Sequence, residues 1–198
     1  MKVIPHYLIP ISLLLALFFT ACKNGNGLSY EEKLQYTKMG GSVVKKTFDT
    51  LSHSLQTAIG AMGIEKAVSY CQVNAHLLTD TYAADSVMIR RTALKYRNAA
   101  NKPDTAEERI LNFFTAQKEK GIANDSLKAI TEKSKDGTIH FYKPIMLQPM
   151  CASCHGDKTA AGLSALWKTI DSLYPADNAY NFKQGDLRGM WHVKFTKK

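Results

Sequence analysis

The sequence predicts one α+β domain that follows a short export segment. The 198 residues are 45% hydrophobic and 22% charged, which is ordinary for a globular protein with a single core. Apolar residues recur every three or four positions over 44–62 and again over 64–82, as on amphipathic helices. Lys135-Asp136-Gly137 separates two strand-like segments, and Asp-Gly is typical of a tight hairpin turn. Helices combined with mainly antiparallel strands define the α+β class.

The N-terminal residues form a separate segment. A basic Lys2 precedes an apolar run over 8–19 that is too short to span a bilayer comfortably, as in a secretory signal. The small residues before Cys22 resemble the lipobox of bacterial lipoproteins, although Phe19 stands where that motif usually has Leu. We therefore expect a lipoprotein signal peptide over 1–21, a tether over 22–28 and the folded domain over 29–198. The alternative is an ordinary secretory signal cut near Ala21, with Cys22 incidental.

The formal net charge of +9 comes from lysines and arginines scattered along the chain. Export argues against nucleic acid as a partner, despite this basic balance. We expect the protein to lie on the periplasmic or cell-surface side of a membrane. It would be anchored in the lipid bilayer through acylated Cys22, since two acyl chains give stable anchoring. A redox or signalling protein that the sequence does not identify is the expected protein partner.

Two predicted helices open the domain. Ser29 followed by Glu32 is a capping box, in which each side chain satisfies a backbone donor at the helix start. The first helix is expected to end between Gly60 and Gly63. In the second, Cys71 lies on the apolar face and therefore points inward.

The later elements are predicted from their caps, turns and alternation. Asp104 or Thr105 is expected to cap a third helix that ends near Gly121. A short helix follows the last cysteine. The predicted strands span 87–94, 127–133, 138–147 and 189–195, and the short helix spans 163–173.

The segment Cys151-Ala152-Ser153-Cys154-His155 has the C-x-x-C-H pattern that attaches c-type haem. Two thiols separated by two residues can form thioethers with both vinyl groups of one porphyrin. The histidine that follows is then carried under the ring, where its imidazole can bind iron. The sequence therefore predicts one haem c, with His155 as the proximal ligand. Covalent attachment takes place outside the cytoplasm, which agrees with the export signal.

Two other sites compete with haem for this motif. A redox dithiol would precede a helix in a βαβ unit, which the predicted elements lack. A zinc site could use Cys71, Cys151, Cys154 and His155. However, an adjacent Cys and His rarely chelate one tetrahedral ion, and no second C-x-x-C is present.

Cys71 is left without a partner once Cys22 is acylated and Cys151 and Cys154 are thioethers. It is either an inert buried thiol or an iron ligand. Met150 adjoins Cys151 and cannot reach the opposite face of a ring. The remaining rivals for the sixth iron position are several other methionines and the histidines His53, His76, His140 and His192.

Several motifs taken together resemble a known family. They are the segments 67–71, 89–98, 101–104, 141–145 and 185–190, and the run Arg91-Thr92 to Asp104 is the most specific. The sequence is similar to small exported c-type haem proteins with a PAS-like fold, formerly a domain of unknown function, whose iron is held by a His and a Cys. The resemblance implies a PAS-like antiparallel sheet with flanking and N-terminal helices around one covalent haem.

The resemblance also implies roles for individual residues. Cys71 becomes the distal thiolate ligand, and Arg91 and Arg97 become possible partners of the haem propionates, because guanidinium forks suit carboxylates. The alternative for the two arginines is solvation or pairing with Asp104 and Glu107. His192 stands where the family has a smaller Ser-Val strand, so it is expected either to approach the haem or to cap an edge strand.

These observations predict a haem-binding lipoprotein that acts in electron transfer or in redox or small-ligand sensing, and not an enzyme. With His155 and Cys71 both bound, the iron offers no open position for a substrate. The alternative from another class is a lipoprotein without haem, a PAS-like ligand-binding or interaction module that holds zinc or no metal.

Overall fold

The structure is a computed structural model that describes residues 27–84 and 86–196. The predicted signal peptide over 1–21 and the predicted acylation site Cys22 lie outside the described residues. Within the described ranges, no helix is both long enough and apolar enough to cross a membrane.

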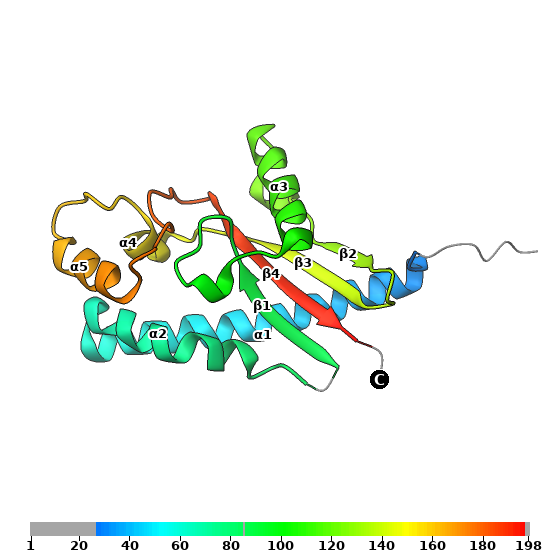
Figure 1. Cartoon of the computed structure of the whole chain (residues 1–198), viewed down its shortest axis with the longest axis horizontal. Helices are drawn as coiled ribbons and strands as arrows, with labels where there is room; N and C mark the ends of the chain where they lie inside the picture. The colour runs from blue at the N-terminus through cyan, green and yellow to red at the C-terminus, as the bar shows by residue number, and fades with distance from the viewer. Residues whose placement is uncertain (1–26, 85, 197–198) are drawn as a thin grey trace, which may run out of the picture.

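Two helices form an N-terminal hairpin, α1 (Tyr30–Met62) and α2 (Ile64–Asp80), which lie side by side (Figure 1). The capping box at Ser29 is confirmed: its hydroxyl accepts from the Glu32 amide at 3.1 Å, and the Glu32 carboxylate accepts from the Ser29 amide at 2.9 Å. Gly63 joins the helices with φ +82°, a conformation that favours glycine. The predicted boundary between the two helices is therefore confirmed.

Four strands form one antiparallel sheet with the order β1-β4-β3-β2. Gly137 closes the predicted β2–β3 hairpin with φ +85°, as expected for the Asp-Gly turn. The α+β class is confirmed, whereas the PAS-like description stays a prediction. The strands are β1 (Val87–Thr92), β2 (Ile130–Lys133), β3 (Ile139–Met146) and β4 (Leu187–Phe195).

The sheet is covered by helices on both faces (Figure 1). On one face, Val44 of α1 packs against inward-facing side chains such as Phe141 and Val193. On the other face, α3 (Thr105–Glu119) packs Ile110, Leu111 and Phe114 against the sheet. Successive residues of β4 therefore alternate between the two faces: Trp191 lies on the α1 side, and Met190 lies on the α3 side.

The cysteine motif lies beyond the end of the sheet, between the sheet and the short helix that sits next to the turn between α1 and α2 (Figure 1). Short elements occupy this end, and α5 packs Leu166, Trp167 and Ile170 onto Val68 of α2. The elements are η3 (Pro149–Cys151), α4 (Ala152–His155) and α5 (Ser164–Leu173). Two further 3₁₀ turns are η1 (Ala99–Asn101) and η2 (Asn124–Ser126).

The observed ends of some elements differ from the predicted ones. Strand β2 begins at Ile130 and not at 127, because Leu127 caps the 3₁₀ turn η2 and its amide donates to the Asn124 carbonyl. Strand β1 ends at Thr92, and α2 ends two residues early, at Asp80. Asp104 is the cap of α3, and it forms a second capping box with Glu107.

Candidate haem site

A cavity of about 310 Å³ lies between the α1–α2 hairpin and the cysteine motif. Pockets of roughly 300–1,000 Å³ are typical of sites for small molecules and cofactors. Much of its wall is apolar, with Phe48, Leu51, Leu55 and Ile59 from α1 and Val68 from α2. The cavity can therefore take a large apolar ligand that carries a few polar groups.

The residues of the C-x-x-C-H motif form one wall of this cavity. Cys151, Cys154 and His155 all line it, and each is half-buried. Burial raises the pKa of both the Cys151 and the Cys154 thiols. The two sulfurs are therefore neutral thiols that face an apolar space, and neither is in a disulfide.

His155 is held in one orientation by a backbone carbonyl. Its Nδ1 lies 2.7 Å from the Ala179 oxygen, and a carbonyl can only accept, so Nδ1 must carry the proton. Burial, together with the positive charges of Arg188 and Arg97, holds the pKa of His155 well below its usual value. The ring is therefore neutral and its Nε2 keeps a free lone pair, which is the state in which histidine binds a metal.

The loop that supplies this carbonyl runs alongside the motif. The Asn181 amide donates to the Gly156 carbonyl at 2.8 Å, and the Phe182 amide donates to the His155 carbonyl at 2.9 Å. Asn181 adopts a positive φ of 59°, which asparagine tolerates better than most residues. The orientation of His155 is thus fixed by main-chain contacts that depend little on side-chain identity.

Cys71 and His76 of α2 line the same cavity. Burial raises the pKa of the Cys71 thiol, and the charges of Arg91 and Arg97 act in the opposite direction. His76 is exposed, and its Nε2 lies 3.3 Å from the Asn98 side-chain amide. The structure thus brings Cys71 together with the motif, and His76 is the histidine on α2 that shares the cavity.

Arg91 and Arg97 also line the cavity, but their contacts differ. The Arg97 guanidinium forms an ion pair with the buried Asp177 at 3.1 Å and donates to the Cys154 and Ala179 carbonyls. The Arg91 guanidinium stacks over the Trp191 ring at 5.8 Å. The alternative pairing of these arginines with Asp104 and Glu107 is wrong.

His192 lies on the opposite face of the sheet, away from the cavity. Its Nδ1 contacts the Glu107 carboxylate at 2.6 Å, and its Nε2 lies 2.9 Å from Nδ1 of His140. The strand that carries it, β4, is an interior strand between β1 and β3. Both expectations for His192 are therefore wrong: it neither lines the cavity nor caps an edge. His140 lies beside His192 on this face of the sheet, and neither His140 nor His53 lines the cavity.

The set proposed for zinc does not converge. Across the described residues, no group of three or more His, Cys, Asp or Glu side chains is placed to hold a metal ion. Cys71, Cys151, Cys154 and His155 line a common space but do not surround one point. Their arrangement suits a ligand that is larger than an ion.

Three residues of the site were missed by sequence reasoning. Asp177 and the Ala179 carbonyl come from a loop with no recognisable pattern, so no sequence signal could have found them. Arg188 also lines the cavity. It belongs to the segment 185–190 that carries part of the family resemblance, so a signal for Arg188 was present.

Comparisons with known proteins agree with this geometry. The family model described as Tll0287-like (Tll0287) matches residues 30–196. A solved structure, the crystal structure of the cyanobacterial haem protein Tll0287, is 26% identical with a TM-score of 0.60; the match covers 86% of this chain and 98% of that one. No curated protein matches the chain.

Proposed function

The chain belongs to the Tll0287-like family, and from this premise we propose that it is a haem protein with one haem c, attached covalently through Cys151 and Cys154. The observation that carries the proposal is the shared cavity, in which Cys151, Cys154, His155 and Cys71 all face one largely apolar space. The similarity to a cyanobacterial haem protein supports the same ligand.

The residues present fit a haem in three respects. Two neutral thiols are available for thioethers, and apolar side chains line the space for the ring. His155 has its Nδ1 occupied by Ala179, which leaves Nε2 for the iron. Cys71 on α2 is the second proposed iron ligand, since a coordinating thiol is deprotonated by the metal even where burial opposes it.

The proposed role is electron transfer or redox or small-ligand sensing, and not catalysis. A bound haem supplies a reversible one-electron couple, and a thiolate ligand stabilises its ferric form. His155 and Cys71 together would occupy both axial positions and leave no site for a substrate. The protein would exchange electrons or signals with a separate redox or signalling protein.

We place the protein outside the cytoplasm as a lipoprotein acylated at Cys22. The support is the apolar run over 8–19, the small residues before Cys22 and the extracytoplasmic chemistry of haem c attachment. Metabolic labelling with a palmitate analogue tests this proposal. Wild-type protein should be labelled and Cys22→Ala should not; equal labelling of the two would contradict it.

The haem proposal is tested by a pyridine haemochrome assay on full-length protein matured in a host that attaches haem c. We expect wild type to keep one haem after acid-acetone extraction, and Cys151→Ala/Cys154→Ala to lose it. Cys71→Ala is the matched control, because it removes a cavity thiol without touching the attachment motif. Wild type that gives colourless protein after extraction would overturn the proposal in favour of the module without haem.

Axial ligation separates a carrier from a sensor. A carrier should stay six-coordinate and low-spin when reduced and should not bind CO. A sensor should lose the Cys71 bond on reduction and then bind CO. Cys71→Ser should change the ferric EPR spectrum, whereas His76→Gln should not. The opposite result would assign the sixth position to His76.

A further inference from the structure

Three arginines gather on the cavity wall beside the cysteine motif. Arg91 comes from β1, Arg97 from the loop that follows it, and Arg188 from the start of β4. We call these three residues the arginine cluster. Three cations in one partly buried wall repel one another unless nearby anions neutralise their charge.

The cluster holds more positive charge than its surroundings neutralise. Arg97 is paired with Asp177, whose carboxylate is 2% exposed. In the part of the chain that the structure describes, neither Arg91 nor Arg188 forms an ion pair with a carboxylate. Since His155 is neutral, three guanidiniums face one carboxylate, which leaves an excess of two positive charges at the cavity.

Arg188 also has an unsatisfied hydrogen-bond donor. One terminal nitrogen donates to the Lys95 carbonyl at 3.0 Å, and the guanidinium lies over the Phe182 ring at 5.3 Å. Its Nε is buried and, among the described residues, has no hydrogen-bond partner. A buried donor left in this state destabilises the protein, so a missing acceptor is expected at this position.

The electrostatics of the cluster agree with a missing anion. Burial, together with the neighbouring positive charges of Arg97 and Arg91, lowers the pKa of Arg188 to about 10. Burial also lowers the pKa of Arg91. Both groups remain cations at neutral pH, and both would be stabilised by a negative partner.

We propose that Arg188 binds a propionate of the haem, and that Arg188, Arg91 and Arg97 together form the binding site for both propionates. The inference rests on the proposed function. An anion that matches this site carries about two negative charges on a largely apolar body, because much of the remaining cavity wall is apolar. A haem has this character, since its two carboxylates project from one edge of the ring. Arginine forks pair with carboxylates through two parallel hydrogen bonds.

The test measures the titration of the propionates themselves. Holoprotein is matured in cells fed 5-aminolaevulinate labelled with ¹³C at its carboxyl carbon, which places the label in the propionates. Their ¹³C signals are then followed against pH. In wild type, both propionates should titrate below about 4.3, the value of an unperturbed glutamate, because nearby arginines lower a carboxyl pKa by about one to three units.

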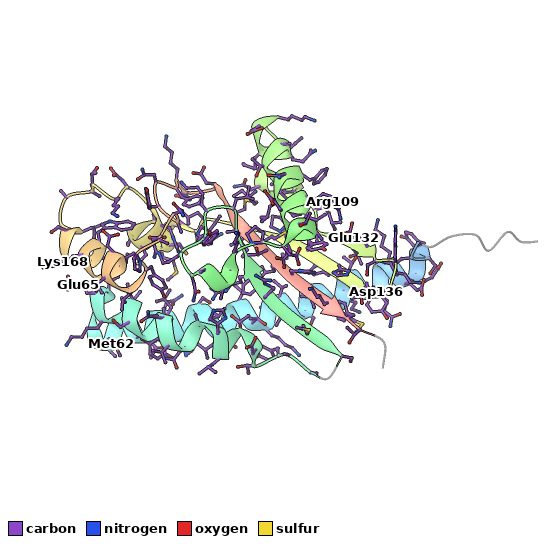
Figure 2. The ribbon with its side chains drawn as sticks, in the orientation of Figure 1. Met62, Glu65, Arg109, Glu132, Asp136 and Lys168 are labelled. Atoms are coloured by element: carbon purple, nitrogen blue, oxygen red, sulfur yellow. The ribbon has the colours of Figure 1, made fainter. Side chains whose placement is uncertain are left out.

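Three variants make the result specific. Arg188→Gln should raise the proton affinity of one propionate at least tenfold, and Arg188→Lys should raise it less, since lysine keeps the charge but not the fork. Arg109→Gln is the matched control, because it removes the same charge from the exposed Arg109–Glu132 pair on α3, away from the α4–α5 end (Figure 2). It should leave both titrations unchanged.

Two results would overturn the inference. One is an Arg188→Gln holoprotein whose two propionates titrate as in wild type. The other needs no variant: a wild-type propionate that titrates above about 4.3 is not paired with the arginine cluster. If Arg188→Gln yields no holoprotein, the wild-type and Arg188→Lys titrations decide the question. Failure of the proposed function is seen separately, as wild-type protein without covalent haem.

Discussion

Two polar clusters lie on opposite faces of the same sheet, and they differ in whether their buried charges are neutralised by neighbouring side chains. On the α3 side, Glu107 contacts His192 at 2.6 Å and Arg90 at 3.5 Å, and it accepts the Asp104 amide at 2.9 Å. We call these four residues, with His140, the glutamate network. Its buried carboxylate is fully paired within the chain.

The arginine cluster on the cavity side is not balanced in this way. Among the described residues, it has an excess of two cations, and the Arg188 Nε has no hydrogen-bond acceptor. A buried charge without a partner is costly, so the excess positive charge of the arginine cluster agrees with the proposed propionates as its counter-charge. The proposed propionate-binding residues therefore differ from the glutamate network in the partners that they lack among the described residues.

The largest expected effect comes from Arg97, which belongs to the arginine cluster but forms an ion pair with the buried Asp177. Arg97→Gln should lower the free energy of unfolding of the holoprotein by about 3–5 kcal/mol, since it leaves Asp177 as a buried carboxylate without its cation. Chemical denaturation measures this loss. Asp177→Asn in the same background should recover part of it, and no recovery would show that the ion pair is not the cause.

Glu107→Gln should be the next largest change. The amide keeps the capping box but removes the charge that pairs with His192 and Arg90, so we expect a loss of about 3 kcal/mol. The haem spectrum should not change, because the network lies on the other face of the sheet. Glu108→Gln, an exposed neighbour on the same helix, should cost less than about 0.5 kcal/mol. Equal losses for the two variants would contradict the comparison.

The pH dependence of stability tests whether the charge of Glu107 is what stabilises the fold on the α3 side. Burial alone would raise the pKa of Glu107, but hydrogen bonds from His192 and the Asp104 amide, with the charge of Arg90, lower it overall. A lowered folded-state pKa contributes stability that is present above the unfolded value of about 4.3 and is lost as pH falls through the folded value. The stability difference between wild type and Glu107→Gln should therefore shrink below about pH 4.3. A stability difference that stays constant from pH 7 to 3 would show that it does not come from the ionised Glu107 carboxylate.

The exposed Arg109–Glu132 pair provides the smallest expected effect. The Arg109 side chain is 59% exposed, and both residues lie at the surface where α3 meets β2 (Figure 2). Arg109→Gln should change the free energy of unfolding by no more than about 0.5 kcal/mol. A larger loss would show that this surface ion pair contributes to the free energy of unfolding as much as a buried one does, which would contradict the contrast between surface and buried charges.

Local signals predicted most of the fold. The capping box at Ser29, the cap of the third helix at Asp104 or Thr105, the glycine at 63 and the Asp-Gly turn each act within a few residues, so the sequence shows them directly. The C-x-x-C-H motif is equally local. The placement of Cys71 on the inward face of α2 followed from helical spacing, and the structure brings it to the same cavity as the motif.

The remaining features depend on long-range contacts that spacing does not encode. Arg97 and Asp177 are 80 residues apart, and the Ala179 carbonyl that orients His155 is a main-chain atom that any residue could supply. His192 was misplaced because the order of the strands decides whether β4 is an edge, and the sequence does not show that order. Arg188 belongs to a segment that carries the family resemblance, but only the structure shows that its buried Nε has no hydrogen-bond partner among the described residues.

The central claim is that a haem is joined covalently to the two cysteines of the motif. Tryptic digestion of matured full-length protein, followed by mass spectrometry, tests it most directly. We expect one haem on the peptide that contains Cys151 and Cys154, with no free thiol at either position. That peptide recovered without haem, with both thiols open to alkylation, would contradict it.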